Sequence, residues 1–326
     1  SWGALDVGAL AHRDGNDDPV HEPPAPVVAE DRSVVVTNPD KVLWPQQGFT
    51  KSDLIDYYEA VADHLLPLIA DRPLVLDRYP DGIEGKSFFQ KNAPDFVPEW
   101  IRTEWIERDD GTGNNYFIVE QADTLRYLAN LASIPLHVWA SRVGSLASPD
   151  WCILDLDPKD APFSSVVTIA RAIRERCDAL GLPSYPKTSG KTGLHLHIPL
   201  GPPLGYPHQK LLGALIAQVI ASRHPDIATT VRTPANRGGR VYIDHLQNGM
   251  GKLIVAPYSV RPVPLATVST PLRWSEVTSS LDVDAYTIRS VPRRLRSLAS
   301  EPLVAILSDT SDIVAGLERL SRSLQG

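Results

Sequence analysis

Apolar and acidic residues alternate along the most informative stretch of the chain, residues 151–157. Its two leucines predict a buried face, because successive side chains of a strand point to opposite sides. Asp155 and Asp157 then share the other face, where two neighbouring carboxylates repel each other unless a cation lies between them. The pattern therefore indicates either a divalent-metal site or a solvated exit into the Asp-Pro turn that follows.

Helical and strand periodicities divide the rest of the chain into further elements. Thr50 caps the first predicted helix, and Gly181 ends the third. The predicted helices are residues 51–69, 122–132, 164–180, 209–223 and most of 284–324. The predicted strands are residues 73–79, 100–107, 116–119, 135–139, 151–157, 241–244 and 252–261, with a strand–turn–strand at 185–200. Residues 1–32 show no sustained periodicity and are interpreted as an acidic, Pro-rich, flexible leader.

A second predicted strand repeats the acidic ending and stops at Asp244. Before it lies a turn of small and hydroxyl-bearing residues, 188–193. Backbone N–H groups in such a turn can cradle phosphate oxygens, and Lys191 can add positive charge, although the spacing is not that of a Walker loop. His195 and His197 follow on one face of the next strand. Zinc would need further ligands, so a histidine contact to a phosphate group fits this context better.

Isolated basic residues suit a nucleic-acid interface in several places. Lys41 and Lys51 flank a turn before a helix, which is a natural phosphate site, although two solvated lysines would give the same pattern. Phe88 and Phe89 lie between lysines; an exposed aromatic there fits base stacking, and two partly buried strand aromatics are the alternative. The arginines of residues 289–296 are typical of a solvated helix face, with contact to a nucleic-acid backbone as the other interpretation.

Composition adds two points to this picture. The chain of 326 residues is 43% hydrophobic and 22% charged, as in ordinary globular proteins, and no apolar run is long enough to span a bilayer. Cys152 and Cys177 are interpreted as reduced core residues. With no recognisable signal peptide, we expect a cytoplasmic protein without a membrane partner. Residues 1–32 carry −5 of the formal net charge of −7, so the total charge does not exclude nucleic-acid binding.

Six motifs in order resemble the polymerase domain of bacterial ligase D, a member of the archaeo-eukaryotic primase superfamily. They read NPDKVLWP at 38–45, SFFQK at 87–91, LDLDP at 154–158, TSGKTGLH at 188–195, VYID at 241–244 and IVAPYSVR at 254–261. The resemblance covers about residues 33–300 and implies a mixed α/β fold, the primase-polymerase catalytic core with an RRM-like central sheet flanked by helices. Residues 301–326 would be a C-terminal helical segment of the same domain.

The resemblance also implies an activity: metal-dependent addition of nucleotides, with ribonucleotides favoured, to a primer 3′ hydroxyl. The reaction would fill short gaps or ends during DNA repair by end joining or excision repair. By this resemblance two metal ions, Mn²⁺ or Mg²⁺, are held by Asp155, Asp157 and Asp244. The implied contacts to the incoming NTP or dNTP are His137, Ser189, Lys191, His195, Arg237, Gln247 and Arg261. The implied contacts to DNA are Asn38, Lys41 and Lys51, which would grip a 5′ phosphate, and Phe88, Phe89 and Lys91.

Two departures from the family pattern concern nucleotide binding. The family more often has a lysine directly before the second glycine of the turn, where Thr192 stands here and Lys191 comes one residue earlier. A lysine is also frequent where this chain has Asp77, so a positive charge near the nucleotide is missing. No ligase motif of the form Lys-x-Asp-Gly and no nuclease module are found. The chain is therefore predicted to be either a stand-alone polymerase or an excised domain.

The expected partners are gapped or broken duplex DNA with a 5′ phosphate, Ku and a DNA ligase, within the bacterial nucleoid. Three other functions fit the same residues: a primase that starts chains de novo, a non-catalytic scaffold that binds DNA ends, and a metal phosphoesterase. The intact carboxylate trio argues against the scaffold. The phosphate turn and the arginines near it favour polymerisation over phosphoester hydrolysis.

Overall fold

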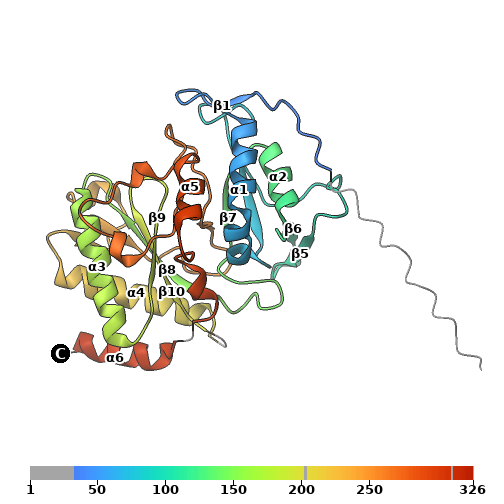
Figure 1. The fold of residues 1–326 in the computed structure, drawn as a ribbon. Helices are drawn as coiled ribbons and strands as arrows, with labels where there is room; N and C mark the ends of the chain where they lie inside the picture. Colours follow the sequence, from blue (N-terminus) through green and yellow to red (C-terminus); the bar gives the residue numbers. More distant parts are fainter. Residues whose placement is uncertain (1–32, 202–203, 310, 326) are drawn as a thin grey trace, which may run out of the picture. The chain divides into compact units, whose positions relative to one another are not determined.

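Two large β-sheets, each with helices packed on it, and a small two-stranded sheet are present in the part of the chain that the structure describes (Figure 1). The structure is a computed structural model and describes residues 33–201, 204–309 and 311–325. The predicted leader, residues 1–32, lies outside the described residues. Among the helices that are described, none is long and apolar enough to cross a membrane.

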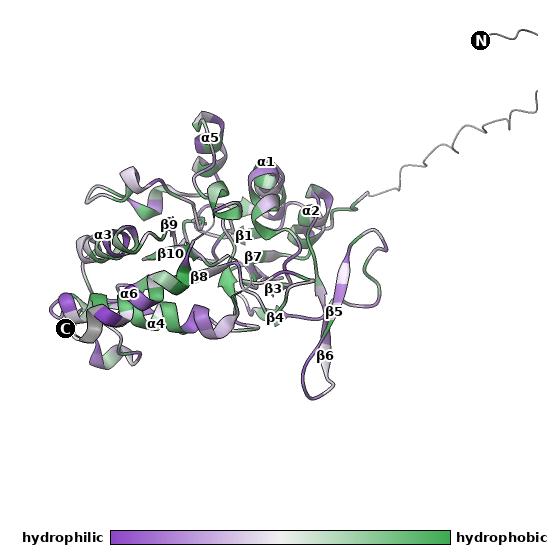
Figure 2. Ribbon diagram, turned by 90° about the horizontal axis from the view of Figure 1, so that it is seen from below, coloured by the Kyte–Doolittle hydropathy of each residue, from purple (hydrophilic) through white to green (hydrophobic). Residues whose placement is uncertain are grey.

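The first sheet has six strands in the order β13-β7-β3-β6-β5, with β4 paired to β3. Helices α1 (Lys51–Ile69) and α2 (Ala122–Asn130) share one hydrophobic core with β3 and β7. The strands are β3 (Leu74–Arg78), β4 (Phe88–Gln90), β5 (Thr103–Glu107), β6 (Gly113–Phe117), β7 (Ser133–Val138) and β13 (Ile254–Val255). A hairpin of β1 (Val42–Trp44) and β2 (Phe49–Thr50) precedes α1. Figure 2 shows β5 and β6 as a second hairpin at the margin of the sheet.

The second sheet has five strands in the order β11-β12-β8-β10-β9. The strands are β8 (Trp151–Asp157), β9 (Tyr185–Thr188), β10 (Leu194–Pro199), β11 (Ala228–Thr229) and β12 (Val241–Asp244). Helices α3 (Phe163–Leu180), α4 (Tyr206–Arg223) and α6 (Ile313–Gln325) share a second hydrophobic core with it. In Figure 2 apolar and polar residues alternate along these helices, as expected when one helix face packs on a core. The predicted mixed α/β architecture is present.

Strand β8 contributes to both hydrophobic cores. Trp151 and Ile153 point into the first core, and the two leucines that the sequence analysis expected to be buried point into the second. Asp155 and Asp157 continue the face of Trp151 and Ile153, but they lie beyond the first core and are partly exposed. The alternation predicted from the sequence is therefore confirmed, and it leaves two carboxylates at the open end of an otherwise buried strand.

Local signals set two helix ends as predicted. The Thr50 hydroxyl accepts from the N–H of Asp53 at 3.3 Å, and the Asp53 carboxylate accepts from the N–H of Thr50 at 2.8 Å, which together form a capping box for α1. Gly181 ends α3 in the left-handed conformation, with a φ of 72°. Both ends need only residues close in sequence, which explains why they could be predicted.

Two strand predictions are wrong in extent. The strand predicted at 252–261 is reduced to β13, because Pro257 has no N–H to donate to a neighbour and Tyr258 has a positive φ of 64°. The strand predicted at 116–119 begins earlier, at Gly113, since the whole hairpin pairs with β5. The first error leaves Arg261, a predicted nucleotide contact, outside the strand to which it was assigned.

The predicted helical segment 284–324 is interrupted. Helix α5 (Ser290–Ser297) stops well before α6, and Pro302 disfavours a helical conformation in the residue before it. Short 3₁₀ helices occupy parts of the irregular segments: η1 (Pro234–Asn236), η2 (Trp274–Glu276), η3 (Val283–Ala285) and η4 (Val304–Leu307). The C-terminal part of the chain is therefore a series of short elements laid over the two cores.

Candidate active site

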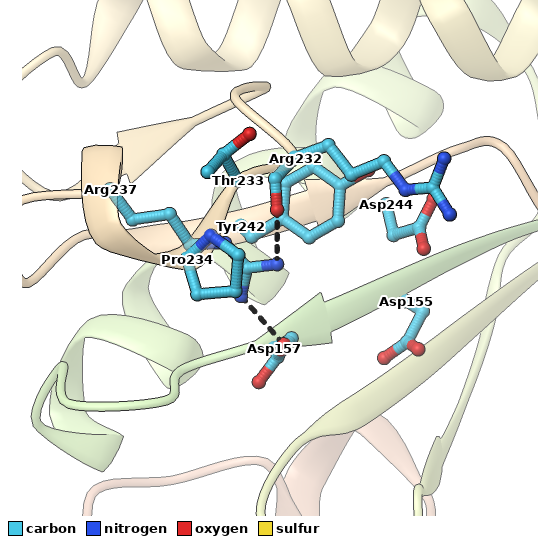
Figure 3. Close-up of a pocket in the computed structure, with 8 residues that line it drawn as sticks. All are labelled: Asp155, Asp157, Arg232, Thr233, Pro234, Arg237, Tyr242 and Asp244. Carbon is cyan, nitrogen blue, oxygen red and sulfur yellow. Dashed lines mark hydrogen bonds and ion pairs between the residues drawn. The ribbon is translucent and has the colours of Figure 1, made fainter.

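Three carboxylates lie side by side on β8 and β12. The strand register pairs Asp244 with Asp155, so their side chains share a face with Cβ atoms about 5 Å apart. Asp157 is two residues further along β8 and points to the same side. All three line a cavity of about 550 Å³ together with Arg232 and Arg237 (Figure 3). The fold thus brings together the three aspartates that the sequence placed on two distant strands.

Each carboxylate has a polar partner of its own. Asp157 Oδ2 accepts from Arg237 Nη1 at 2.7 Å, as Figure 3 shows. Asp155 Oδ1 lies 3.4 Å from His195 Nε2. Asp244 Oδ1 accepts at 2.7 Å from the backbone N–H two residues further on. Gln247, another predicted contact, is exposed, and its Nε2 lies 3.4 Å from Asp244 Oδ2.

These separate contacts bear on the predicted metal site. Within the described residues, no three His, Cys, Asp or Glu side chains converge on one metal position. The donors are nevertheless of the type that hard divalent cations prefer, since all are carboxylate oxygens on one face of the sheet. A shared site would require Asp157 to turn from Arg237 towards Asp155 and Asp244. The ligand set therefore fits the predicted cations in chemistry and register, and the metal assignment stays a prediction.

A row of polar side chains runs from Asp155 into the interior of the sheet. His195 of β10 pairs with Asp155 on one side and with Lys187 of β9 on the other. Lys187 is fully buried; its Nζ lies 2.9 Å from His195 Nδ1 and also contacts Ser269 Oγ. Burial, and then the charge of Lys187, lowers the pKa of His195 to about 4, so its ring is neutral at pH 7.

The hydrogen bonds around His195 determine its tautomer. Burial opposes ionisation of Asp155, but His195 and other neighbours outweigh it and lower the pKa of the carboxyl, so Asp155 is an anion that can only accept. Nε2 of the neutral ring therefore carries the proton, and Nδ1 is left as an acceptor. Lys187 donates to Nδ1 and also to Ser269, whose own proton goes to the carbonyl of Thr188 at 2.8 Å. His195 thus presents an N–H to the cavity side of the row.

The sequence analysis gave Lys187 no role. The feature that could have identified Lys187 is the pairing of β9 with β10, because its register places Lys187 opposite His195. That register could not be derived in advance, because the length and type of the turn at 189–193 were not known.

The turn between β9 and β10 lets other groups come close to its backbone. Ser189 Oγ accepts from the N–H groups of Lys191 and Gly193, each at 3.1 Å, so its own O–H remains available to donate. Gly190 has a φ of 73°, and a Cβ atom there would lie 2.4 Å from Cγ of Arg261. The turn therefore packs directly against Arg261, as expected if both contact the same anion.

The remaining predicted nucleotide contacts lie close to this turn. His137 of β7 is half-buried, and its ring centroid lies 5.7 Å from that of Phe89. Burial, followed by the charges of Arg261, Lys191 and Lys187, lowers the pKa of His137 to about 3. Lys187 and Arg261 also lower the pKa of Asp155 on β8, and the charge of Asp155 in turn acts on Lys191. His137, the turn and Arg261 therefore form one cluster beside the carboxylates.

Asp77 adds a negative charge to this cluster. Its side chain is 7% exposed, and its Oδ2 accepts from the Tyr79 hydroxyl at 3.2 Å. Burial raises the pKa of Asp77, against the opposing effects of Tyr79, Arg261 and Lys191. Where the family often carries a lysine, this chain therefore has a carboxylate that partly offsets the charge of Arg261 and Lys191.

Two of the three residues predicted to grip a 5′ phosphate, Asn38 and Lys41, line a separate cavity. This cavity, of about 650 Å³, is lined by residues 38–41. Lys41 Nζ pairs with Asp81 at 2.9 Å. Lys51 is only 6% exposed, and its Nζ donates to the carbonyl of Thr37 at 2.6 Å. The alternative of two solvated lysines is therefore wrong for Lys51, whose pKa is lowered by burial and then by the charge of Lys41.

Strand β4 exposes both of its phenylalanines. Phe88 is 46% and Phe89 61% exposed, and neither belongs to a hydrophobic core. The alternative of two partly buried strand aromatics is wrong, because β4 is a three-residue strand that pairs only with β3. Arg78 lies over the Phe88 ring at 5.1 Å, and Lys91, also exposed, follows the strand. The strand thus presents two aromatic faces next to positive charge, as base stacking requires.

A family profile described as "LigD, primase-polymerase domain" matches residues 50–303. The chain belongs to this family. Membership confirms the resemblance drawn from the six motifs and makes the chain a nucleotidyltransferase.

Individual relatives of the LigD family agree with this assignment. The chain is 36% identical over 284 residues to the bifunctional non-homologous end joining protein LigD of Bacillus subtilis, covering 83% of this chain and 46% of that protein. It is 32% identical over 288 residues to the multifunctional non-homologous end joining protein LigD of Mycolicibacterium smegmatis, covering 87% of this chain and 36% of that protein. The chain thus spans less than half the length of these relatives.

A solved structure confirms the predicted fold. The polymerase domain from Mycobacterium tuberculosis ligase D, solved in complex with DNA, matches with a TM-score of 0.80 and 32% sequence identity. The match covers 86% of this chain and 100% of that chain. The two-sheet arrangement is therefore that of a LigD polymerase domain.

Proposed function

We propose that this domain is a DNA-dependent polymerase that adds nucleotides to a primer 3′ end and fills short gaps or ends in DNA repair. The observation that carries the proposal is the register that sets Asp244 and His195 on either side of Asp155, next to a turn suited to phosphate. The LigD relatives named for non-homologous end joining, and the neighbour solved with DNA, support a role in joining or repairing DNA ends. Such a role would place the protein in the cytoplasm, at the nucleoid.

The residues of the site have distinct parts in the proposed reaction. Asp155, Asp157 and Asp244 would hold two divalent cations, Mn²⁺ or Mg²⁺, which supply activation of the primer hydroxyl and stabilisation of the leaving pyrophosphate. His195 would donate its Nε2–H, and Ser189 its O–H, to triphosphate oxygens that can only accept. Arg261 and Lys191 would neutralise triphosphate charge. Arg237, His137 and Gln247 would orient the incoming nucleotide.

Finer aspects of the proposal concern substrates and partners. We include in it a preference for ribonucleotides, gapped or broken duplex DNA with a 5′ phosphate, and cooperation with Ku and a DNA ligase. Their support is the family resemblance and, for the 5′ phosphate, the cavity at residues 38–41 with two lysines beside it.

One assay tests the proposal and its competitors together. Extension is measured on a gapped duplex with and without the 5′ phosphate, comparing NTP with dNTP in Mn²⁺ and in Mg²⁺. We expect extension with release of pyrophosphate, and faster extension with the phosphorylated gap. Product on an unprimed single strand would identify a primase, and release of inorganic phosphate a phosphoesterase. DNA binding without extension under every condition would leave only the scaffold function.

The 5′-phosphate pocket can be tested through Lys41. We expect Lys41→Ala to remove the preference for a phosphorylated gap, a loss of roughly tenfold in the affinity ratio, because one charge-assisted contact is lost. Binding to gapped duplexes with and without the phosphate measures it. Arg108→Ala, which removes one exposed charge from the β5–β6 hairpin, is the control and should keep the preference. A Lys41→Ala protein with unchanged preference would mean that the pocket is assigned to the wrong ligand.

The close packing of the phosphate turn makes a second prediction. In Gly190→Ala the new Cβ would meet Arg261 Cγ at 2.4 Å, so we expect KM for the nucleotide to rise roughly tenfold as Arg261 is displaced. Gly144→Ala is the matched control, because Gly144 also has a positive φ, 88°, but nothing lies within 4 Å of a Cβ there. Steady-state kinetics and thermal unfolding of both variants separate the site from backbone strain. Equal KM values for the two variants would contradict the prediction.

A further inference from the structure

A second cavity adjoins the carboxylates on the side of Asp244 that faces away from His195. It has a volume of about 500 Å³, and the cationic residues that line it are Lys210 of α4, Arg232 and Lys252. Asp244 is the one acidic residue lining it, and Arg232 also lines the cavity of the three aspartates. The two cavities therefore form a continuous polar surface.

The two lysines approach each other in spite of their like charge. A Cβ atom at Gly249 would lie 3.2 Å from Lys210 Cε and 3.2 Å from Lys252 Cγ, so both side chains pass the same glycine. Both are exposed, and within the described residues neither they nor Arg232 form an ion pair. Converging cations without a carboxylate partner create a local positive potential that attracts a polyanion. The absence of a partner distinguishes them from Arg237 and Lys41, each of which pairs with an aspartate.

The geometry of phosphoryl transfer indicates which substrate would approach from the side of this surface. The attacking and leaving oxygens lie roughly in line on opposite sides of the phosphorus. The phosphate turn and Arg261 lie on the His195 side of Asp155, so the leaving pyrophosphate belongs there. The attacking 3′ oxygen, and the strand that carries it, must then approach from the opposite side. That side holds Asp244 and the two lysines.

We propose that Lys210 and Lys252 bind phosphates of the primer strand just upstream of its 3′ end. The inference rests on the proposed polymerase function and adds to it a binding site for the strand being extended. Each lysine supplies one phosphate contact, and Arg232, at the border of the two cavities, lies nearest to the reacting end.

The test is a binding measurement that needs no catalysis. The probe is a fluorescent DNA hairpin with a recessed 3′ end, titrated by anisotropy without divalent cations at several salt concentrations. For Lys210→Ala/Lys252→Ala we expect the slope of log K against log salt to fall by about 1.8, and the affinity at 0.1 M salt to drop roughly eightfold per lysine. The matched control is Arg176→Ala/Arg223→Ala, a second pair of neighbouring cations. Arg223 lies about 20 Å from Lys210 along α4.

A second arm locates the contact on one strand. Neutral methylphosphonates replace single phosphates near the 3′ end of the primer or at matching positions of the template. We expect primer-strand substitutions to weaken binding to the natural protein and to have little further effect on the double lysine variant, since the same contacts are already lost. An unchanged salt slope in the double variant, or coupling to the template strand instead, would overturn the proposal.

These outcomes remain separate from the fate of the proposed function. If the natural protein extends no primer under any condition, the polymerase proposal fails, whatever the salt slopes show. If it does extend primers while the double lysine variant has the natural KM for the DNA hairpin, only the primer-strand site fails. We expect a raised KM for DNA with an unchanged KM for the nucleotide.

Discussion

Asp155→Ala should abolish primer extension and leave DNA binding largely intact. Asp155 pairs with Asp244 on one side and with His195 on the other, so its loss removes the carboxylate that we propose to bind the metal ions next to the phosphate-binding residues. We expect the rate to fall by at least about 10³-fold, as when a charge-stabilising group is removed from a transition state. Asp157→Ala should behave in the same way and should also release Arg237 from its ion pair.

Two further variants make this result interpretable. Asp155→Asn keeps the shape of the side chain and its contact to His195, so it should fold normally yet be as inactive as Asp155→Ala. Asp160→Ala removes an exposed carboxylate whose ion pair is with Lys159 at 3.4 Å, and it should extend primers at the natural rate. Extension in a time course, with binding by anisotropy, measures both properties. Normal extension by Asp155→Ala or Asp157→Ala would show that the metal ligands are assigned wrongly.

Lys187→Met should give the second-largest loss of activity without loss of stability. Without the donor at Nδ1, only the 3.4 Å contact to Asp155 Oδ1 favours the proton at Nε2, so the other tautomer of His195 becomes accessible. Removing such an outer partner of a site histidine typically costs about 10- to 100-fold in activity. Methionine fills the buried space of Lys187 with an apolar chain and removes a buried amine whose pKa burial holds well below its usual range, and this gain offsets the hydrogen bond lost at Nδ1. We therefore expect kcat to fall while the unfolding temperature is kept.

The tautomer itself provides a readout that a purely structural role would not change. ¹⁵N chemical shifts of the histidine rings should report Nε2–H for His195 in the natural protein and a mixture of tautomers in Lys187→Met. Ser269→Ala is the control, because it removes the other acceptor of Lys187 and leaves the bond to His195. It should keep the natural tautomer and most of the activity. A single, unchanged tautomer in Lys187→Met would contradict the role of Lys187 as a positioning residue.

Local patterns predicted the elements that depend on neighbouring residues. The capping box at Thr50, the left-handed Gly181 and the alternation along β8 all appear where the sequence placed them. Errors arose where tertiary context decides the conformation. Pro257 and the positive φ of Tyr258 shorten a strand whose apolar residues suggested a longer one. For the phenylalanines of β4 the sequence left partial burial open, and the structure exposes both.

The sequence by itself determined that Asp155 and Asp157 share a face, because the period of a strand is two wherever the strand lies. Through six motifs it also indicated the family, which the profile match confirms, and it predicted which residues surround the turn at 189–193. Tertiary structure alone decided which of these residues touch. The register of β9, β10, β8 and β12 sets Lys187, His195, Asp155 and Asp244 in one row, and folding brings Lys210 and Lys252 together at Gly249. Such contacts join residues far apart in the chain, so they follow from strand pairing and core packing and not from any local period.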